Sequence, residues 1–403
     1  MSKDKLKNIQ LSDSWLKAIV IGSLWASFEI IVGSFLHNLR MPFAGTILSA
    51  FAVMFLVAFY QIWPQRWIIL RAGIICALMK SISPSAVIFG PMIGIFSEAL
   101  ILEIIILLFG KNLFSYILGA GLAVFSALLH KVLNLILLYS FDLVEVYINL
   151  INFAAVKLNL PESSPIQLII LLSMVYLITG FISAIVGYII GKKAIRIKPD
   201  KKYYPLKKTI KEEEKNSGIF SKFLLILHFL SLIIGLWFLS QEYSFFLKFS
   251  LISVYIIFCL SRYKNLFRRL LKPLFWTQLL VILILAAIFL ENSKEEFSLQ
   301  LALFSGFTML LRAVFVITCF SAISREIANP LIKNFLLKRR NVYMKIYYAL
   351  QTGFRTFPIM IENYSEFKLF YKKPFQTFVR IISEAENWLE SIKSQQKNNS
   401  ESF

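Results

Sequence analysis

Hydrophobic residues form long runs along most of the chain, and several reach the roughly 20 residues that a helix needs to cross a bilayer core. Each run predicts a membrane-spanning helix, near residues 15–36, 42–62, 66–80, 84–109, 113–139, 166–190, 219–239, 244–261, 273–290 and 300–322. The segment 142–160 predicts a helix and loop at the outer surface. The pattern therefore predicts an all-α polytopic membrane protein, with about six spans followed by about four.

The hydrophobic pattern changes between residues 306 and 389. From SREIANPLIKNF (324–335) onward, apolar residues recur three or four positions apart, and Lys, Arg and Glu stand between them. This spacing is typical of amphipathic helices that lie against a surface rather than span lipid. We therefore expect cytoplasmic helices that meet a soluble partner.

Composition and charge agree with a membrane protein and predict its orientation. The chain is 58% hydrophobic, with mean hydropathy +0.69 and net charge +20. Residues 191–217 hold ten Lys and Arg against four acidic residues, and such clusters favour the cytoplasmic side. Nucleic-acid binding is the alternative for a basic segment, but these charges lie at span ends. We predict that both termini are cytoplasmic, and that the charged N-terminus, which shows no signal cleavage site, leads into a retained span.

The basic segment divides the chain into two membrane blocks. Residues 1–195 contain more small residues and interrupted helices, and we expect them to bind substrate. A basic cytoplasmic linker (196–217) leads to a second transmembrane domain (218–324) that is richer in Leu, Ile and Phe. Residues 325–403 are predicted to form cytoplasmic coupling helices and a disordered C-terminus. Two different modules fit this division better than one inverted repeat.

Polar residues inside apolar spans are costly, so they usually face a cavity or a partner. We expect Arg71 and Glu103 to form a structural ion pair toward the inner face. The Pro- and Gly-broken stretch 83–94 favours a cavity, because irregular backbone at membrane depth usually lines one. The candidates for an outward-opening substrate pocket are His37, Asn38, Arg40, Lys80, Ser81, Ser83, His130, Lys131 and Asn134. Snorkelling or solvation of a helix end is the alternative for each of them.

Neither a metal site nor a catalytic site is predicted. The three cysteines lie in apolar runs without paired spacing, and the three histidines are not at ligand spacing. The sequence contains no G-x-x-x-x-G-K-[ST] loop for nucleotide phosphates and no nucleophile–base arrangement. We therefore expect a protein that is not an enzyme and holds no cofactor.

A stripe of small residues lies on the first predicted span. Ala18, Gly22 and Ala26 are four residues apart and fall on one helix face. Small residues at this spacing let another helix backbone approach closely. The stripe predicts a docking face for the second block, and ordinary packing inside the first block is the alternative.

The second block resembles a known transporter component. The ordered features are a basic inner loop ending in Leu-Lys-Pro with Trp276, a span with Arg312, an acidic turn before Pro330, and a helix with Arg355, Pro358 and Glu362. Over roughly residues 218–392 this order is similar to the transmembrane T component of energy-coupling factor (ECF) vitamin transporters. By position and architecture, the first block resembles the substrate-binding S component, and the small-residue stripe resembles the motif with which S components dock.

The resemblance implies an ATP-driven importer of a small vitamin or precursor in a bacterial inner membrane. Two separate ECF-type ATPase subunits would hold ATP and Mg²⁺, and the apolar faces of the tail would pack against them. The family's Ala-Arg-Gly-like coupling motifs are missing, and Tyr-Lys-Lys-Pro stands at the first such position. The expected coupling cations are Arg355, Lys372, Lys373 and Arg380. Partners would then be the ATPases, the small substrate and the lipid bilayer, without nucleic acid.

Two alternatives belong to other classes. One is an ion-coupled secondary transporter in which Glu29 and Glu98 carry protons. The other is a membrane-embedded enzyme or accessory factor of lipid or isoprenoid metabolism, although no Asp-Asp-x-x-Asp-like motif is present.

Overall fold

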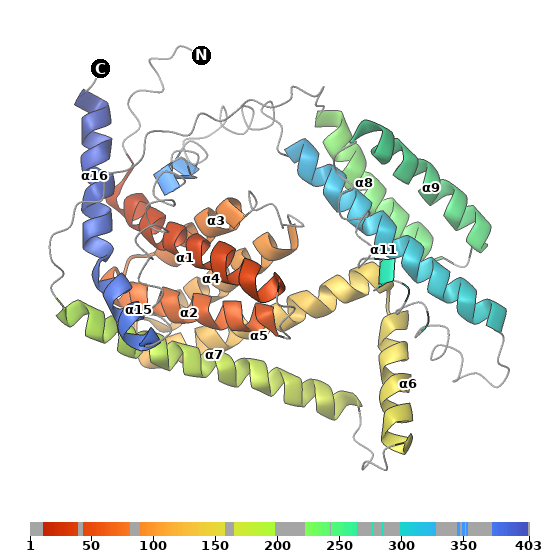
Figure 1. The fold of residues 1–403 in the computed structure, drawn as a ribbon, viewed down its shortest axis with the longest axis horizontal. Coiled ribbons are helices and arrows are strands. Elements are labelled where there is room, and N and C mark those ends of the chain that lie inside the picture. Colours follow the sequence, from red (N-terminus) through yellow and green to blue (C-terminus); the bar gives the residue numbers. More distant parts are fainter. Residues whose placement is uncertain are drawn as a thin grey trace. The chain divides into compact units, whose positions relative to one another are not determined.

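The fold is all-α over the described part of the chain (Figure 1). The computed structural model describes residues 11–38, 43–80, 89–157, 165–197, 222–241, 243–263, 276–277, 280, 284, 299–327, 345–346, 349–350, 352–353 and 373–401. Within these ranges every regular element is a helix, as the sequence pattern predicts.

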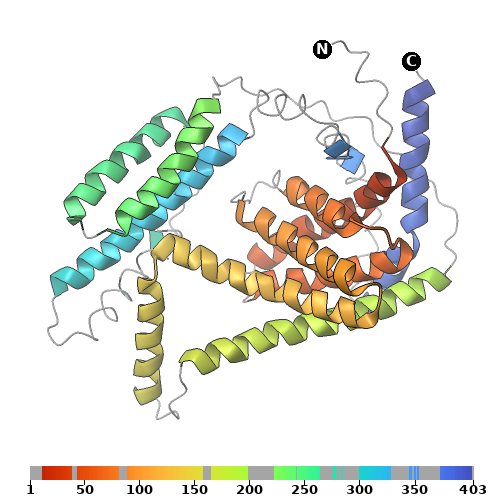
Figure 2. The ribbon, with the colours of Figure 1, turned by 180° about the vertical axis from the view of Figure 1, so that it is seen from behind.

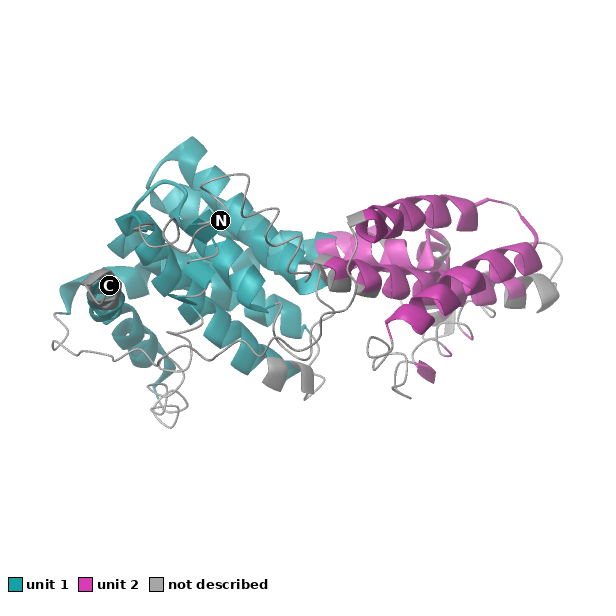
Figure 3. Cartoon of the chain, turned by 90° about the horizontal axis from the view of Figure 1, so that it is seen from above, with its two compact units in different colours: residues 1–129, 173–215, 336–403 teal, residues 130–172, 216–335 magenta. Residues whose placement is uncertain are grey.

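Two compact units make up the chain (Figure 3). The first comprises residues 1–129, 173–215 and 336–403, and the second comprises residues 130–172 and 216–335. The first unit therefore contains the C-terminal helices as well as most of the N-terminal block.

The helices of unit 1 come from the two ends of the chain and the segment before the linker. They are α1 (Asp13–Asn38), α2 (Ala44–Ile62), α3 (Ile68–Lys80), α4 (Phe89–Phe109), the start of α5 (Leu113–Tyr139), most of α7 (Pro165–Arg196), α15 (Pro374–Ser383) and α16 (Ala385–Glu401). Helix α1 packs along α3, and α3 packs along α4. The core of unit 1 includes large side chains that are almost fully buried, among them Trp25, Phe59 and Met79.

Small residues let several helices of unit 1 approach closely. A Cβ at Gly187 of α7 would lie 2.4 Å from the carbonyl oxygen of Met54 in α2. One turn further on, a Cβ at Gly191 would lie 2.7 Å from the carbonyl oxygen of Ala58. Only glycine allows backbones to pack at this distance. Figure 2 shows α7 crossing this part of the unit.

Unit 2 is built around a three-helix bundle of α8 (Lys222–Leu239), α9 (Phe245–Arg262) and α11 (Leu299–Ile327). Helix α6 (Asp142–Lys157) and the end of α5 also belong to this unit. Packing of Tyr139 and Val146 against Met309 and Val314 joins α5 and α6 to α11. A second core, which includes Phe315, joins α8, α9 and α11. The bundle exposes large apolar side chains, and Phe246 is 73% exposed. A lipid-facing surface has this character.

Six described helices are long and apolar enough to cross a membrane. They lie at Asp13–Gly33, Ala44–Ile62, Gly90–Phe109, Leu113–Tyr139, Ile166–Arg196 and Phe245–Arg262. Shorter apolar helices occupy Phe223–Leu239 and Gly306–Phe320, and most of the expected span 273–290 lies outside the described residues. The protein is therefore a polytopic helical membrane protein.

One element differs from the sequence prediction. The C-terminus, which we expected to be disordered, forms helix α16 as far as Glu401. The physical reason is that Trp388, Leu389 and Ile392 share one buried face of this helix, so tertiary packing compensates for its polar composition.

Candidate functional site

A buried ion pair joins α1 to α3 in unit 1. The Lys80 Nζ atom lies 2.6 Å from the backbone oxygen of Glu29 and 3.5 Å from its Oε2 atom. Gly33, one turn beyond Glu29, provides the space, since a Cβ there would lie 3.0 Å from Lys80 Nζ. Both side chains are buried, so each needs the other to offset its lost hydration.

Three further polar side chains surround this ion pair, and with it they form what we call the inner polar cluster: Glu29, Ser49, Cys76, Lys80 and Glu98. The carboxyl group of Glu98 on α4 is near Glu29 and beside the Ser49 hydroxyl of α2. The Cys76 thiol of α3 is fully buried among Glu29, Lys80 and Glu98. The Ser49 Oγ atom is buried. Two buried carboxyl groups thus lie near each other in an apolar interior, and the ammonium group of Lys80 pairs with the one on Glu29.

The structure brings only some of the predicted pocket residues together. Lys80 contacts Glu29, while the Asn134 Nδ2 and His130 Nε2 atoms lie 3.0 Å apart, one turn apart on α5. Lys131 follows His130 in the sequence, and its side chain is exposed. Arg40, Ser81 and Ser83 lie outside the described residues, as do the side chains of His37 and Asn38 in α1. Substrate binding by this set stays a prediction.

The small-residue stripe of α1 is packed inside unit 1. A Cβ at Gly22 would lie 2.7 Å from the carbonyl oxygen of Ala72 and 2.8 Å from Ile75 Cβ, both in α3. Ala18 and Ala26 are fully buried. Close approach of α3 is enough to account for these small residues, which is the alternative that the sequence left open. A role in docking a second module stays a prediction.

Glu103 binds the start of α3 instead of pairing with Arg71. Its Oε1 atom accepts a hydrogen bond from the Trp67 N–H at 2.6 Å, and its Oε2 atom accepts bonds from Ile69 at 2.8 Å and Leu70 at 3.2 Å. The Arg71 guanidinium lies over the Trp15 ring, 5.3 Å from its centroid. The two charges still attract each other, but no direct ion pair between them is found among the described residues, because the unpaired N–H groups at a helix start offer a carboxylate several donors at once.

The C-terminal helices pack on unit 1 itself. Phe378 of α15 stacks on Phe51 of α2 with ring centroids 5.8 Å apart. The Trp63 Nε1–H donates to Glu386 Oε1 of α16 at 2.7 Å, and Lys393 Nζ lies 2.6 Å from Asp13 Oδ1 of α1. We expected the apolar faces of the tail to pack against partner subunits. The faces of α15 and α16 are instead buried within the chain, because α1 and α2 offer them an aromatic surface.

Of the expected coupling cations, two are described. Lys373 precedes α15 and is exposed. Arg380 is also exposed, and its Nε atom lies 3.6 Å from Glu384 Oε1 in the next turn. Arg355 and Lys372 lie outside the described residues. Coupling through these cations stays a prediction.

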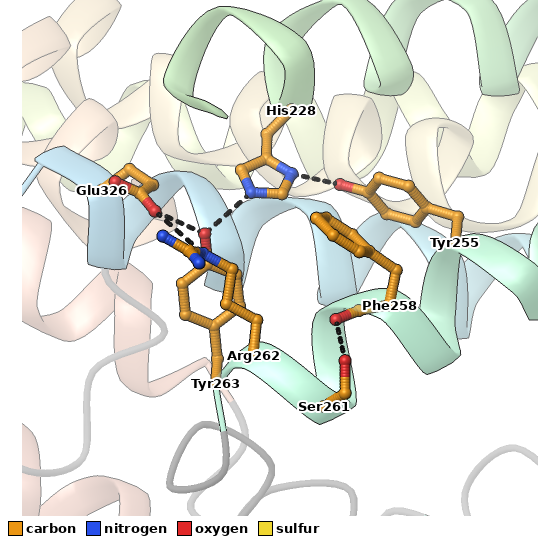
Figure 4. Close-up of polar contacts among 7 residues, drawn as sticks. All are labelled: His228, Tyr255, Phe258, Ser261, Arg262, Tyr263 and Glu326. Atoms are coloured by element: carbon orange, nitrogen blue, oxygen red, sulfur yellow. Dashed lines mark hydrogen bonds and ion pairs between the residues drawn. The ribbon is translucent and has the colours of Figure 1, made fainter. Parts of the chain in front are cut away.

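A second polar cluster, which sequence reasoning missed, joins the three bundle helices of unit 2 (Figure 4). His228 of α8 is fully buried, and its ring nitrogens bond to two phenol groups: Nδ1 lies 2.8 Å from the Tyr255 hydroxyl and Nε2 lies 3.0 Å from the Tyr263 hydroxyl. Tyr263 donates to Glu326 Oε1 of α11 at 2.5 Å, and Arg262 Nε lies 3.9 Å from the same oxygen. We call these five residues the His228 cluster.

The available sequence signal for this cluster was weak. His228 is not at metal-ligand spacing from the other two histidines, and no group of three or more metal-binding side chains occurs among the described residues. The pairing of a histidine early in one apolar helix with tyrosines late in the next depends on how the helices pack. Comparison of the chain with protein-family models, with curated proteins and with solved structures finds no match. The two clusters therefore have to be interpreted from their own chemistry.

Proposed function

We propose that the protein is the membrane subunit of an ATP-driven importer of the energy-coupling factor type. Its N-terminal block would capture a small vitamin or precursor, and its C-terminal block would couple that block to two separate ATPase subunits that hold ATP and Mg²⁺. The observation that carries the proposal is the ordered pattern of Leu-Lys-Pro, Trp276, Arg312, Pro330, Arg355, Pro358 and Glu362 in residues 260–362. A polytopic helical fold is compatible with this role.

Arg312 gives the pattern a structural basis in unit 2. Its Nε atom donates to the backbone oxygen of Leu137 at 3.2 Å, and its Nη1 atom donates to Ser240 Oγ at 3.3 Å. A single guanidinium thus ties α11 to the ends of α5 and α8, which is a use of several donors that lysine could not match. An arginine in this position would keep the second block rigid while a partner moves its cytoplasmic end.

The packing of the tail changes which surface would face the ATPases. Because the apolar faces of α15 and α16 are covered by unit 1, we assign ATPase contact to exposed cations such as Lys373 and Arg380. Cations on an exposed helix face suit carboxylates on a partner. Without Ala-Arg-Gly-like motifs, this contact would be mainly electrostatic. We place it at the cytoplasmic face of a bacterial inner membrane.

Affinity purification tests this proposal. We expect the full-length tagged chain, extracted from its native membrane in mild detergent, to carry two ATPase subunits that mass spectrometry identifies and that hydrolyse ATP. A variant without residues 325–403 should lose them. A matched variant, Lys111→Ala, changes a cation outside the tail and should keep them. If the full-length chain brings down no ATPase, the proposal fails.

The inner polar cluster favours a second candidate function, an ion-coupled secondary transporter. Glu29 and Glu98 are 5% and 6% exposed and lie near each other, and Lys80 pairs with Glu29. A carboxyl group in this position can take up a proton or a small cation during transport. This candidate requires no ATPase partner, so the same purification experiment separates the two.

A further inference from the structure

The hydrogen bonds of the His228 cluster have a defined direction. The Tyr263 hydroxyl has one proton, which it donates to Glu326. Burial and the adjacent Glu326 carboxylate raise the pKa of Tyr263 above its usual range, so the hydroxyl keeps this proton. Towards His228 the Tyr263 oxygen can therefore only accept, and His228 Nε2 must be the protonated nitrogen of that bond.

The other ring nitrogen completes the chain of bonds. In a neutral imidazole whose proton is on Nε2, the Nδ1 atom is an acceptor. The Tyr255 hydroxyl, 2.8 Å away, then donates to it. Every bond in the series Tyr255, His228, Tyr263 and Glu326 thus points the same way (Figure 4). Hydrogen bonds aligned in one direction polarise each other and form a path along which a proton can shift.

The structure assigns to the His228 cluster a binding site for one exchangeable proton, shared between His228 and Glu326 through the Tyr263 hydroxyl. When a proton arrives at His228 Nδ1, the Nε2 proton passes to the Tyr263 oxygen and the Tyr263 proton passes to Glu326 Oε1. The products are a neutral imidazole with its proton on Nδ1 and a neutral Glu326 carboxyl group. No atom is lost, and the charge of the added proton is offset by the former carboxylate.

The surroundings of Tyr255 make this second state possible. With a proton on Nδ1, the Tyr255 oxygen becomes the acceptor and its own proton must find another partner. The thiols of Cys259 and Cys319 lie beside the Tyr255 hydroxyl, and either sulfur can accept a hydrogen bond from it. The titratable and charged groups that face the site are His228 on α8, Tyr255, Cys259, Arg262 and Tyr263 on and after α9, and Cys319 and Glu326 on α11.

The location gives the proton a structural consequence. His228 is near the start of α8, Tyr263 directly follows α9, and Glu326 is near the end of α11. The site therefore holds together one end of the three-helix bundle, where the chain leaves α11 towards the tail. Neutralising Glu326 weakens its attraction to Arg262, so proton binding would loosen this end. The inference does not depend on whether ATP or an ion gradient drives transport.

Nitrogen-15 NMR of the histidine ring tests this inference. In the full-length chain with His37→Gln and His130→Gln, His228 is the only labelled histidine, since the chain has three. At alkaline pH we expect a neutral ring with its proton on Nε2. On acidification we expect the ring to stay neutral and the proton to appear on Nδ1, with loss of the Nε2–H signal.

Two variants make the result decisive. Glu326→Gln keeps an oxygen that accepts from Tyr263 but cannot take up the proton, so acidification should give a doubly protonated ring. Tyr263→Phe removes the connecting hydroxyl and should likewise abolish the transfer from Nε2 to Nδ1. A variant that unfolds at the same temperature as the wild-type chain is folded, and one folded variant is enough for the test. If the wild-type ring and the folded variant titrate alike, or if the wild-type ring begins with its proton on Nδ1, the inference is overturned.

Discussion

Replacing Lys80 with Met should lower the free energy of unfolding by about 3–5 kcal/mol, the usual cost of removing one partner of a buried ion pair. The Glu29 side chain is 7% exposed, and its carboxylate would lose the ammonium group 3.5 Å away. Methionine fills a similar volume, so the loss reports the uncompensated charge rather than a cavity. Reversible unfolding in mixed detergent micelles, followed by tryptophan fluorescence, measures it.

Two variants serve as controls for Lys80→Met. Lys17→Met breaks a pair whose Asp13 side chain is 47% exposed, so it should cost about 1 kcal/mol or less. Glu29→Gln combined with Lys80→Met removes both charges and should recover most of the lost stability. A Lys80→Met variant as stable as Lys17→Met would contradict a buried, mutually dependent pair.

Replacing Glu103 with Ala should cost about 3 kcal/mol or more, because three backbone N–H groups at the start of α3 lose their only described acceptor. Trp67, which precedes α3, has φ +62°, a left-handed conformation that its hydrogen bond to Glu103 helps to hold. We expect the amide hydrogens of Ile69 and Leu70 to exchange faster in this variant, before the rest of unit 1 is affected.

Glu103→Gln and Glu390→Ala complete this test. The glutamine keeps one acceptor oxygen and should show an intermediate loss. Glu390 is exposed on α16, and its replacement should change stability by about 0.5 kcal/mol or less. Unchanged exchange at Ile69 and Leu70 in Glu103→Ala would mean that water or another group satisfies these donors.

The helical membrane fold could be predicted from sequence because it depends on local pattern. Apolar runs such as 113–139 predict α5 to the residue, since run length alone decides whether a helix can span. The helix expected at 142–160 corresponds to α6, Asp142–Lys157, and its place at the outer surface stays a prediction. The run at 66–80 likewise predicts α3, Ile68–Lys80, but its packing along α1 and α4 could not be read from the pattern.

The polar sites were harder to predict because they depend on packing between distant segments. Glu29 and Lys80 are far apart in sequence, and the polar pattern favours Lys80 as a residue of an outward pocket rather than as a partner of Glu29. Glu103 was expected to bind Arg71, but the start of α3 offered three N–H donors in a better position. The amphipathic pattern of α15 correctly predicted a helix with one apolar face, yet it carried no information on which surface would cover that face.

We propose that ATP hydrolysed by separate subunits drives import. Membrane vesicles prepared right side out from cells that express the chain and its associated ATPases, loaded with ATP and offered a pool of labelled vitamins and precursors, test it most directly. We predict that accumulation continues when ionophores collapse all ion gradients and stops when internal ATP is removed. Accumulation that is lost with the gradients while ATP is present, and that also requires Glu98, would contradict the claim.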